Sequence, residues 1–126
     1  MLKKIRYIGS VVREKLKSNR RSSKWDETRD AFIKSNPLCA ACGSTKKLQV
    51  HHIQPFHLHP ELELDLNNLI TLCMDINECH LKIGHGGSFS CYNPRAVMQA
   101  KRFLAEPDPD IRESIIEVCK ATREKS

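Results

Sequence analysis

Two cysteine pairs constrain the fold of this chain most, because they lie far apart in the sequence and together offer four ligands to one ion. The first pair, Cys39 and Cys42, has two residues between its members, and the following Gly43 can adopt the backbone angles of a tight turn. The second pair, Cys73 and Cys79, has five residues between its members. Four thiolates on one zinc ion would tie both segments together, so we expect a structural zinc site.

A redox pair and free thiols are the alternatives to zinc. In a thioredoxin-like protein, Cys-x-x-Cys ends a strand and opens a helix, whereas here a predicted helix precedes Cys39 and a predicted hairpin follows it. Only 40% of the 126 residues are hydrophobic, so a metal ion would add stability that a modest core supplies only in part. Cys119 lies on the apolar side of a predicted helix and is expected to be a buried structural thiol.

The positive charge is concentrated at the N-terminal end. The formal net charge is +6, and residues 1–24 hold nine Lys or Arg residues against one acidic residue, Glu14. Such an arm suits a polyanion, since Lys and Arg release counterions from phosphates, although a solvated tail or a membrane-surface helix has the same composition. No secretory signal and no run of about 20 apolar residues is found, so we expect a cytoplasmic protein that does not enter the membrane.

Hydrophobic periodicity predicts an α+β fold. Two short strands, 48–53 and 69–73, are joined by a long loop and followed by a brief helix over 78–83. Three flanking helices are predicted, near 23–36, over 95–104 and over 110–125. Ser23 is expected to cap the first helix, and Asp110 and Glu113 can cap the last. Its apolar face is predicted to hold Ile111, Ile115, Val118, Cys119 and Thr122. We expect an arm (1–22), a central domain (23–94) and a C-terminal helical extension (95–126) packed on that domain.

The adjacent histidines His51 and His52 stand on the first predicted strand. Successive strand residues point to opposite faces, so both can serve one site only if the strand twists, bulges or ends there. The alternative is one histidine in the core and one in solvent. The loop histidines His57 and His59 lie beside acidic residues and are expected to be solvated.

Taken together, the fragments "CAAC", "LQVHHIQPF", "NNLITLC" and "CH" resemble the HNH endonuclease family, over about residues 23–95. The preceding "KWDETRDAFIKSNPLC" looks like the lead-in helix of phage and prophage members. This resemblance implies a ββα-metal core stapled by a structural zinc on Cys39, Cys42, Cys73 and Cys79. It also implies that His51 and His80 hold a catalytic metal, that His52 is the general base, and that the catalytic Asn68 braces the loop and orients His52.

The activity implied by the resemblance is metal-dependent DNA endonuclease cleavage, with 5′-phosphate and 3′-hydroxyl products and double-stranded DNA as the expected partner. Two imidazoles leave the coordination shell of the catalytic metal incomplete, so water and phosphate oxygens would fill the remaining positions. Such a shell allows Mg²⁺, Mn²⁺, Ni²⁺ or Zn²⁺. Arg20, Arg21, Lys24 and Lys82 are candidate phosphate contacts. The alternatives are a non-catalytic zinc-dependent nucleic-acid-binding module and a thiol oxidoreductase that uses Cys39 and Cys42.

Two features depart from the family pattern. The segment "MDINE", residues 74–78, lengthens the second cysteine pair and precedes the helix that carries His80. A further histidine in the family stands one helical turn beyond the last motif histidine, whereas His85 follows His80 by five residues and comes directly after Gly84. His85 is therefore a candidate ligand of the metal or of a phosphate, rather than an assigned metal ligand.

Overall fold

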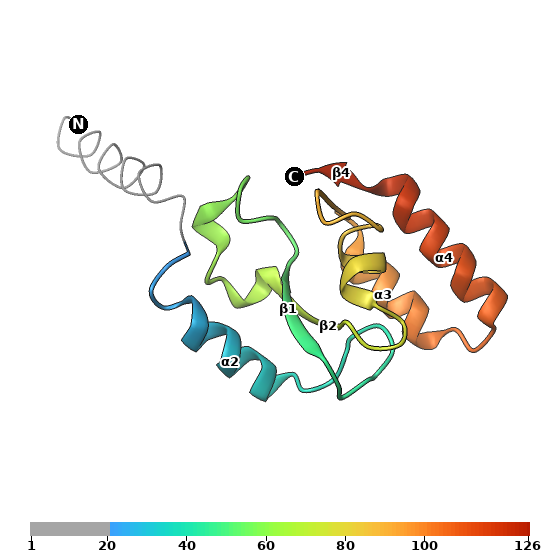
Figure 1. The fold of residues 1–126 in the computed structure, drawn as a ribbon, viewed down its shortest axis with the longest axis horizontal. Helices are drawn as coiled ribbons and strands as arrows, with labels where there is room; N and C mark the ends of the chain where they lie inside the picture. Colours follow the sequence, from blue (N-terminus) through green and yellow to red (C-terminus); the bar gives the residue numbers. More distant parts are fainter. Residues whose placement is uncertain (1–20) are drawn as a thin grey trace.

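An antiparallel hairpin forms the centre of the protein, whose computed structural model describes residues 21–126 (Figure 1). Strands β1 (Leu48–His52) and β2 (Leu69–Cys73) pair so that Leu48 lies opposite Cys73 and His52 opposite Leu69. Every residue of β2 is buried. The two predicted strands and the α+β class are confirmed.

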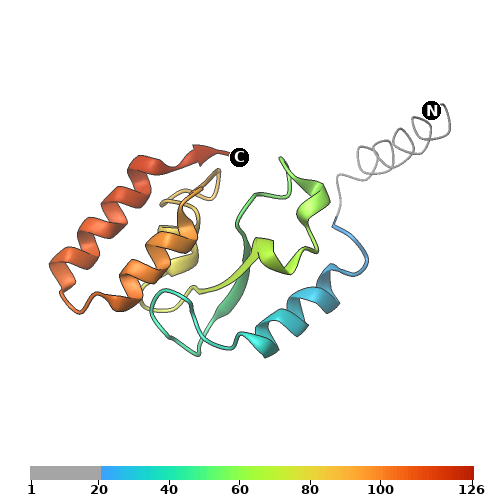
Figure 2. The same ribbon diagram turned by 180° about the vertical axis from the view of Figure 1, so that it is seen from behind.

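Helical elements cover both sides of this hairpin. Helix α2 lies on one side, while η3, α3 and α4 lie on the other, as the views from front and back agree (Figures 1 and 2). The 3₁₀ turns η1 and η2 belong to the loop that joins the strands, and short strands β3 and β4 form a second, two-stranded sheet. The bounds are α2 Trp25–Ser35, η1 Pro60–Leu62, η2 Leu66–Asn68, η3 His80–Gly84, β3 Cys91–Tyr92, α3 Ala96–Ala105, α4 Pro109–Thr122 and β4 Glu124–Lys125.

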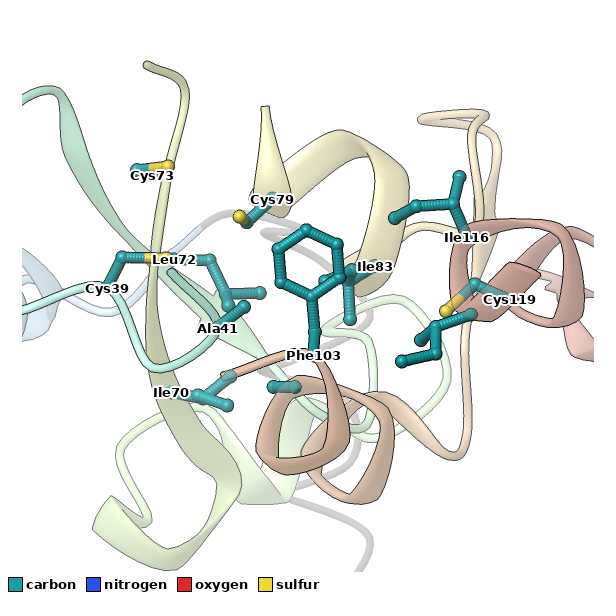
Figure 3. Packing of buried hydrophobic residues seen from close by; sticks show 12 residues of the cluster. Cys39, Ala41, Ile70, Leu72, Cys73, Cys79, Ile83, Phe103, Ile116 and Cys119 are labelled. Atoms are coloured by element: carbon teal, nitrogen blue, oxygen red, sulfur yellow. The ribbon is translucent and has the colours of Figure 1, made fainter. Parts of the chain in front are cut away.

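One hydrophobic cluster joins the cysteine segments to the C-terminal helices. Phe103 of α3 lies between Leu72 of β2 and Ile83 of η3, and Cys119 of α4 completes the far side (Figure 3). Leu72, Ile83 and Cys119 are fully buried. Burying such side chains contributes about 1.5 to 3 kcal/mol each, so this cluster holds η3 against β2. Cys119 is a buried thiol, as predicted.

The two predicted helix caps are wrong, and so is part of the predicted apolar face of α4. Lys24, not Ser23, occupies the N-cap of α2, and no side chain caps that end. At the start of α4, the side chain of Asp108 accepts a hydrogen bond from the backbone N–H of Asp110, because Pro109 in the first turn favours a start there. On the same helix, Ile116 is buried and contacts the core.

Of the apolar residues predicted to share one face of α4, some are buried and others are exposed to solvent. Ile111 and Val118 are 46% and 42% exposed, since Ile115, Ile116 and Cys119 form the line of contact with the core.

Arg20 and nearly all of the predicted arm lie outside the described residues. Within residues 21–126, no helix is both long enough and apolar enough to cross a membrane.

Candidate metal centres and active site

The four predicted cysteines converge. Their sulfur atoms all lie within 4.8 Å of one another, and the Sγ atoms of Cys42 and Cys73 are 3.5 Å apart. Tetrahedral zinc with Zn–S bonds of about 2.3 Å places its sulfurs about 3.8 Å apart, and all the cysteines are free of disulfides. A hydrogen bond from the Cys79 thiol lowers the pKa of Cys39 well below its usual range, because it stabilises the thiolate. The donor set and spacing fit a closed structural zinc site.

Local backbone hydrogen bonds set both halves of this cluster. In the first turn, the N–H of Gly43 donates to the carbonyl of Cys39 at 2.9 Å, and Gly43 adopts a left-handed φ of 75°. The N–H of Ala40 donates to the carbonyl of Thr71, which attaches this turn to β2. The first cysteine pair is thereby held beside the end of the hairpin.

The inserted segment, residues 74–78, loops outward without separating the second pair. Ile76 at its tip is 88% exposed, and Glu78 adopts a left-handed φ of 47° just before Cys79. Asp75 accepts a hydrogen bond from the Ser44 hydroxyl at 3.0 Å, so the two cysteine segments also contact each other beyond the sulfurs. The five-residue spacer therefore lets both sulfurs reach the cluster.

Three histidines form a second cluster, and two of them, His80 and His85, stand at the start of η3 and directly after its end. One ring nitrogen from each of His51, His80 and His85 lies within 4.8 Å of the others. The Nε2 atoms of His80 and His85 are 3.2 Å apart, and the rings of His51 and His85 have centroids 4.7 Å apart. The candidate His85 thus lies with His51 and His80, the two histidines that the family resemblance implied as metal ligands.

A π-helical turn explains how His80 and His85 meet. The backbone N–H of His85 donates to the carbonyl of His80 at 3.1 Å, which is a step of five residues rather than four. In an α-helix, five residues would turn the chain by about 140° past a full circle, so the rings would point apart. The wider turn places both on the side that faces β1.

Close packing supports this geometry at Gly84. A Cβ atom there would lie 3.0 Å from Cδ1 of Leu72 and 3.2 Å from Cε1 of His51. Glycine therefore lets the turn approach β1 closely enough for the histidine rings to meet.

Hydrogen bonds at Nδ1 of His80 and His85 leave the Nε2 atom of each ring with a lone pair. Nδ1 of His85 donates to the carbonyl of Cys91 at 2.7 Å, and Nδ1 of His80 is 2.6 Å from Oε1 of Gln49, which accepts. The Nε2 atoms of both rings are then acceptors, and the buried Nε2 of His51 has no hydrogen-bond partner. Facing acceptors repel unless a cation lies between them, and histidine ligands of metals are commonly held this way through the other nitrogen.

Burial keeps the three rings neutral. It lowers the pKa of His80 to about 4, and it also lowers the pKa values of His51 and His85 below their usual range, with further lowering at His51 from its imidazole neighbours. A neutral imidazole is the form that binds a metal ion.

His52 follows His51 on β1 but faces different neighbours. Its ring lies 4.4 Å from that of Trp25, and its Nε2 is 2.9 Å from the carbonyl of Glu63, so Nε2 carries the proton and donates. Nδ1 therefore carries no proton, and it accepts a hydrogen bond from the guanidinium of Arg21 at 3.3 Å. Burial is the main cause that lowers the pKa of His52, and the charge of Arg21 adds to it.

Asn68 braces the loop between the strands. Its Oδ1 accepts from the N–H of Gln54 at 2.8 Å, and its Nδ2 donates to the carbonyls of Gln54 and Leu62 at 3.1 and 3.3 Å. Leu62 immediately precedes Glu63, whose carbonyl holds the His52 ring. Asn68 therefore contacts His52 only through the loop backbone.

The adjacent histidines His51 and His52 both line one pocket, because β1 ends at His52 and the chain turns away there. The pocket has a volume of about 210 Å³. Two aromatic side chains, Phe56 and Phe89, stand at it, and Phe89 is 56% exposed. Its lining is Arg21, Val50, His51, His52, Pro55, Phe56, His57, His80, His85, Phe89, Tyr92 and Ser126.

The remaining predicted residues are dispersed. Arg21 lines the histidine pocket, and Lys24 is exposed at the start of α2. Lys82 lies 3.9 Å from the carboxylate of Glu78 and lines a different cavity, beside Arg112. His57 is exposed at the rim of the pocket, whereas Nδ1 of His59 pairs with Glu61 at 3.0 Å.

Two side chains that matter to this site were missed from sequence. Gln49 holds His80, and a signal existed, since residues two apart on a strand share a face and Gln49 shares that of His51. Glu63 gave no signal, because its position depends on the path of the long loop.

A β-hairpin followed by a helical turn, with one cluster of four cysteines and one of three histidines, defines a small α+β metal-binding domain. Residues 39–86 match the family model described as HNH endonuclease, so this part of the chain is similar to an HNH domain. This range holds both clusters, and the resemblance seen in the sequence is confirmed. Searches of curated proteins and of solved structures found no match to the chain.

Proposed function

We propose that this protein is a metal-dependent DNA endonuclease that hydrolyses phosphodiester bonds. The observation that carries the proposal is the convergence of His51, His80 and His85 in one pocket beside Nδ1 of His52, the ring nitrogen that carries no proton. The match of residues 39–86 to the HNH endonuclease model supports nucleic acid as the substrate class. A basic N-terminal sequence supports the same partner.

The three imidazoles would hold the catalytic divalent ion, Mg²⁺, Mn²⁺, Ni²⁺ or Zn²⁺. The buried Nε2 of His51, which lacks a hydrogen-bond partner, and the facing acceptors of His80 and His85 fit a cation there. Such an ion would polarise the scissile phosphate and stabilise the leaving 3′-oxygen. Adding His85 to the shell strengthens the preference for borderline metals over Mg²⁺, because imidazole suits Ni²⁺ and Zn²⁺ better than Mg²⁺.

His52 would act as the general base through Nδ1. Its Nε2 proton is engaged by the carbonyl of Glu63, so Nδ1 has the lone pair that takes a proton from water. Asn68 would act through the loop backbone to keep that carbonyl in place. Positioned general bases contribute about 10² to 10⁴ in rate.

The cysteine cluster would hold a structural zinc that joins the hairpin to η3, since a closed thiolate site has no open position for substrate. Arg21, which lines the pocket, Lys24 at the start of α2 and Lys82, which lines a different cavity, are proposed phosphate contacts. A cytoplasmic location and the division into arm, HNH domain and helical extension complete the proposal.

Plasmid cleavage tests the function directly. The purified protein, with Mg²⁺, Mn²⁺, Ni²⁺ or Zn²⁺ added in turn, should nick or cut plasmid DNA, and His52→Ala should lower the rate by about 10² or more. His59→Ala is the matched control, because that imidazole pairs with Glu61 in the loop and lies outside the histidine cluster.

Zinc content and circular dichroism should be unchanged in His52→Ala, so that lost cleavage reports chemistry rather than folding. If the wild-type protein binds DNA but cleaves no faster than His52→Ala with any of the metals, a non-catalytic nucleic-acid-binding module is the better description. A protein without bound zinc whose Cys39 and Cys42 form a reversible disulfide would instead favour the oxidoreductase alternative.

A further inference from the structure

Glu63 is a buried carboxylate in the loop between the strands, with only 5% of its surface exposed. A buried charge is costly unless hydrogen bonds and an opposite charge compensate it. Both carboxylate oxygens of Glu63 accept from the backbone N–H of Ser22, at 3.0 and 3.1 Å. The guanidinium of Arg21 lies 3.9 Å from the same carboxylate.

The same residue contacts the proposed base with a different group. The backbone carbonyl of Glu63 accepts from Nε2 of His52, while its side chain holds residues 21 and 22. Arg21 in turn reaches Nδ1 of His52 at 3.3 Å. One loop residue is thus attached to both nitrogens of the ring, directly at one and through Arg21 at the other.

Two aromatic rings also contact the guanidinium of Arg21. Its guanidinium carbon lies 4.7 Å from the centre of the Phe56 ring and 5.2 Å from that of Trp25. Trp25 also stacks against His52. Arg21 also lines the histidine pocket, so a planar guanidinium held by ring faces and a carboxylate can offer its remaining N–H donors to a phosphate bound there.

We propose that Glu63 is a positioning residue, whose carboxylate docks Arg21 beside His52 so that the arginine meets the scissile phosphate next to the base. This inference rests on the proposed nuclease function. In the free protein Arg21 covers Nδ1 of His52. A bound phosphate competes for the guanidinium and thereby frees the nitrogen that takes the proton from water.

A proteolysis measurement tests the docking without any cleavage of DNA. The amide nitrogen of the Arg21–Ser22 bond is the group that donates to Glu63, so trypsin should cut this bond slowly in the wild-type protein. Glu63→Ala and Glu63→Gln should be cut there about tenfold faster or more, as mass spectrometry can localise. Glu61→Gln, an exposed carboxylate in the same loop, should leave the rate unchanged.

Kinetics test whether Glu63 acts through Arg21. Arg21→Ala and Glu63→Gln should each lower kcat by about 10-fold to 100-fold and change KM for DNA by much less, because the contact is made to the reacting phosphate. The double variant should be no slower than the slower single variant. Arg21→Lys should not restore the rate, since an ammonium lacks the planar donors.

The outcomes separate the two proposals. Equal tryptic rates in the wild type and both Glu63 variants, or multiplicative losses of kcat in the double variant, would overturn the role of Glu63. A wild-type protein that cleaves no DNA would overturn the nuclease proposal, and the tryptic rates would then still decide the docking. Unchanged zinc content in Glu63→Gln shows that the fold is intact.

Discussion

The backbone N–H of His85 donates to the carbonyl of His80, 3.1 Å away, and this five-residue step brings both imidazoles to one point opposite His51. An α-helical turn would direct the two rings apart. The π-helical turn is therefore part of the metal-binding geometry, in keeping with the frequent occurrence of such turns at functional sites.

His85 should contribute to metal affinity as His80 does. Replacing either with Ala removes one of three nitrogen ligands, so we expect binding of Ni²⁺ or Mn²⁺ to weaken by at least about tenfold in each variant. Isothermal titration calorimetry on zinc-loaded protein measures this, with His59→Ala as a control that keeps wild-type affinity. An unchanged affinity in His85→Ala would remove His85 from the shell.

Gln49 should matter to the same ion without touching it. Its Oε1 accepts from Nδ1 of His80 at 2.6 Å, and loss of such partners typically weakens metal affinity by about 10- to 100-fold. Gln49→Leu should show that loss, whereas Gln49→Glu keeps an acceptor and should stay near wild type. Comparable affinities for the Leu and Glu variants would contradict the role.

Gly84→Ala should cost both stability and metal binding. The added methyl would press on Cδ1 of Leu72 at 3.0 Å and on the His51 ring at 3.2 Å, and overpacking of this kind costs about 1 to 3 kcal/mol. Gly43→Ala is the comparison, because nothing lies within 4 Å of its Cβ and only its left-handed backbone is strained. Thermal unfolding gives the stability, and calorimetry should show weakened Ni²⁺ binding in Gly84→Ala alone.

Loss of a cysteine from the four-sulfur cluster should unfold the domain. Structural zinc contributes apparent binding energies of about 10 to 16 kcal/mol in zinc-finger peptides, so Cys79→Ser or a strong chelator should abolish cooperative unfolding. Cys91→Ala should retain one zinc per chain, since Cys91 lies outside the cluster. A folded, zinc-free Cys79→Ser protein would show that packing alone holds the fold.

The pH dependence of cleavage should follow His52. Burial, with help from Arg21, lowers the pKa of this ring, so the neutral base persists below pH 6.5 and protonation removes activity only at lower pH. A divalent cation nearby shifts the pKa in the same direction. The acid limb of kcat/KM should therefore lie below about pH 6.5 at saturating metal. A limb above pH 7 would exclude His52, as described, as the titrating base.

Local sequence determined the elements that depend on neighbouring residues. Alternating apolar residues gave β1 and β2, periodicity gave the helices, and two cysteine pairs indicated four converging sulfurs, because these signals lie in spacing along the chain. Helix ends were less certain, as Asp108 rather than Asp110 or Glu113 caps α4.

Only the tertiary structure decided how the histidines are used. Packing of Gly84 against Leu72 and His51 accompanies the π-helical turn that brings in His85, and this close contact is between segments more than ten residues apart. Glu63 reaches His52 because a long loop folds back over β1, and loop paths depend on contacts that no local pattern encodes. The amino-acid sequence determined the spacing of the ligands along the chain, whereas packing between distant segments determined the orientation of their side chains.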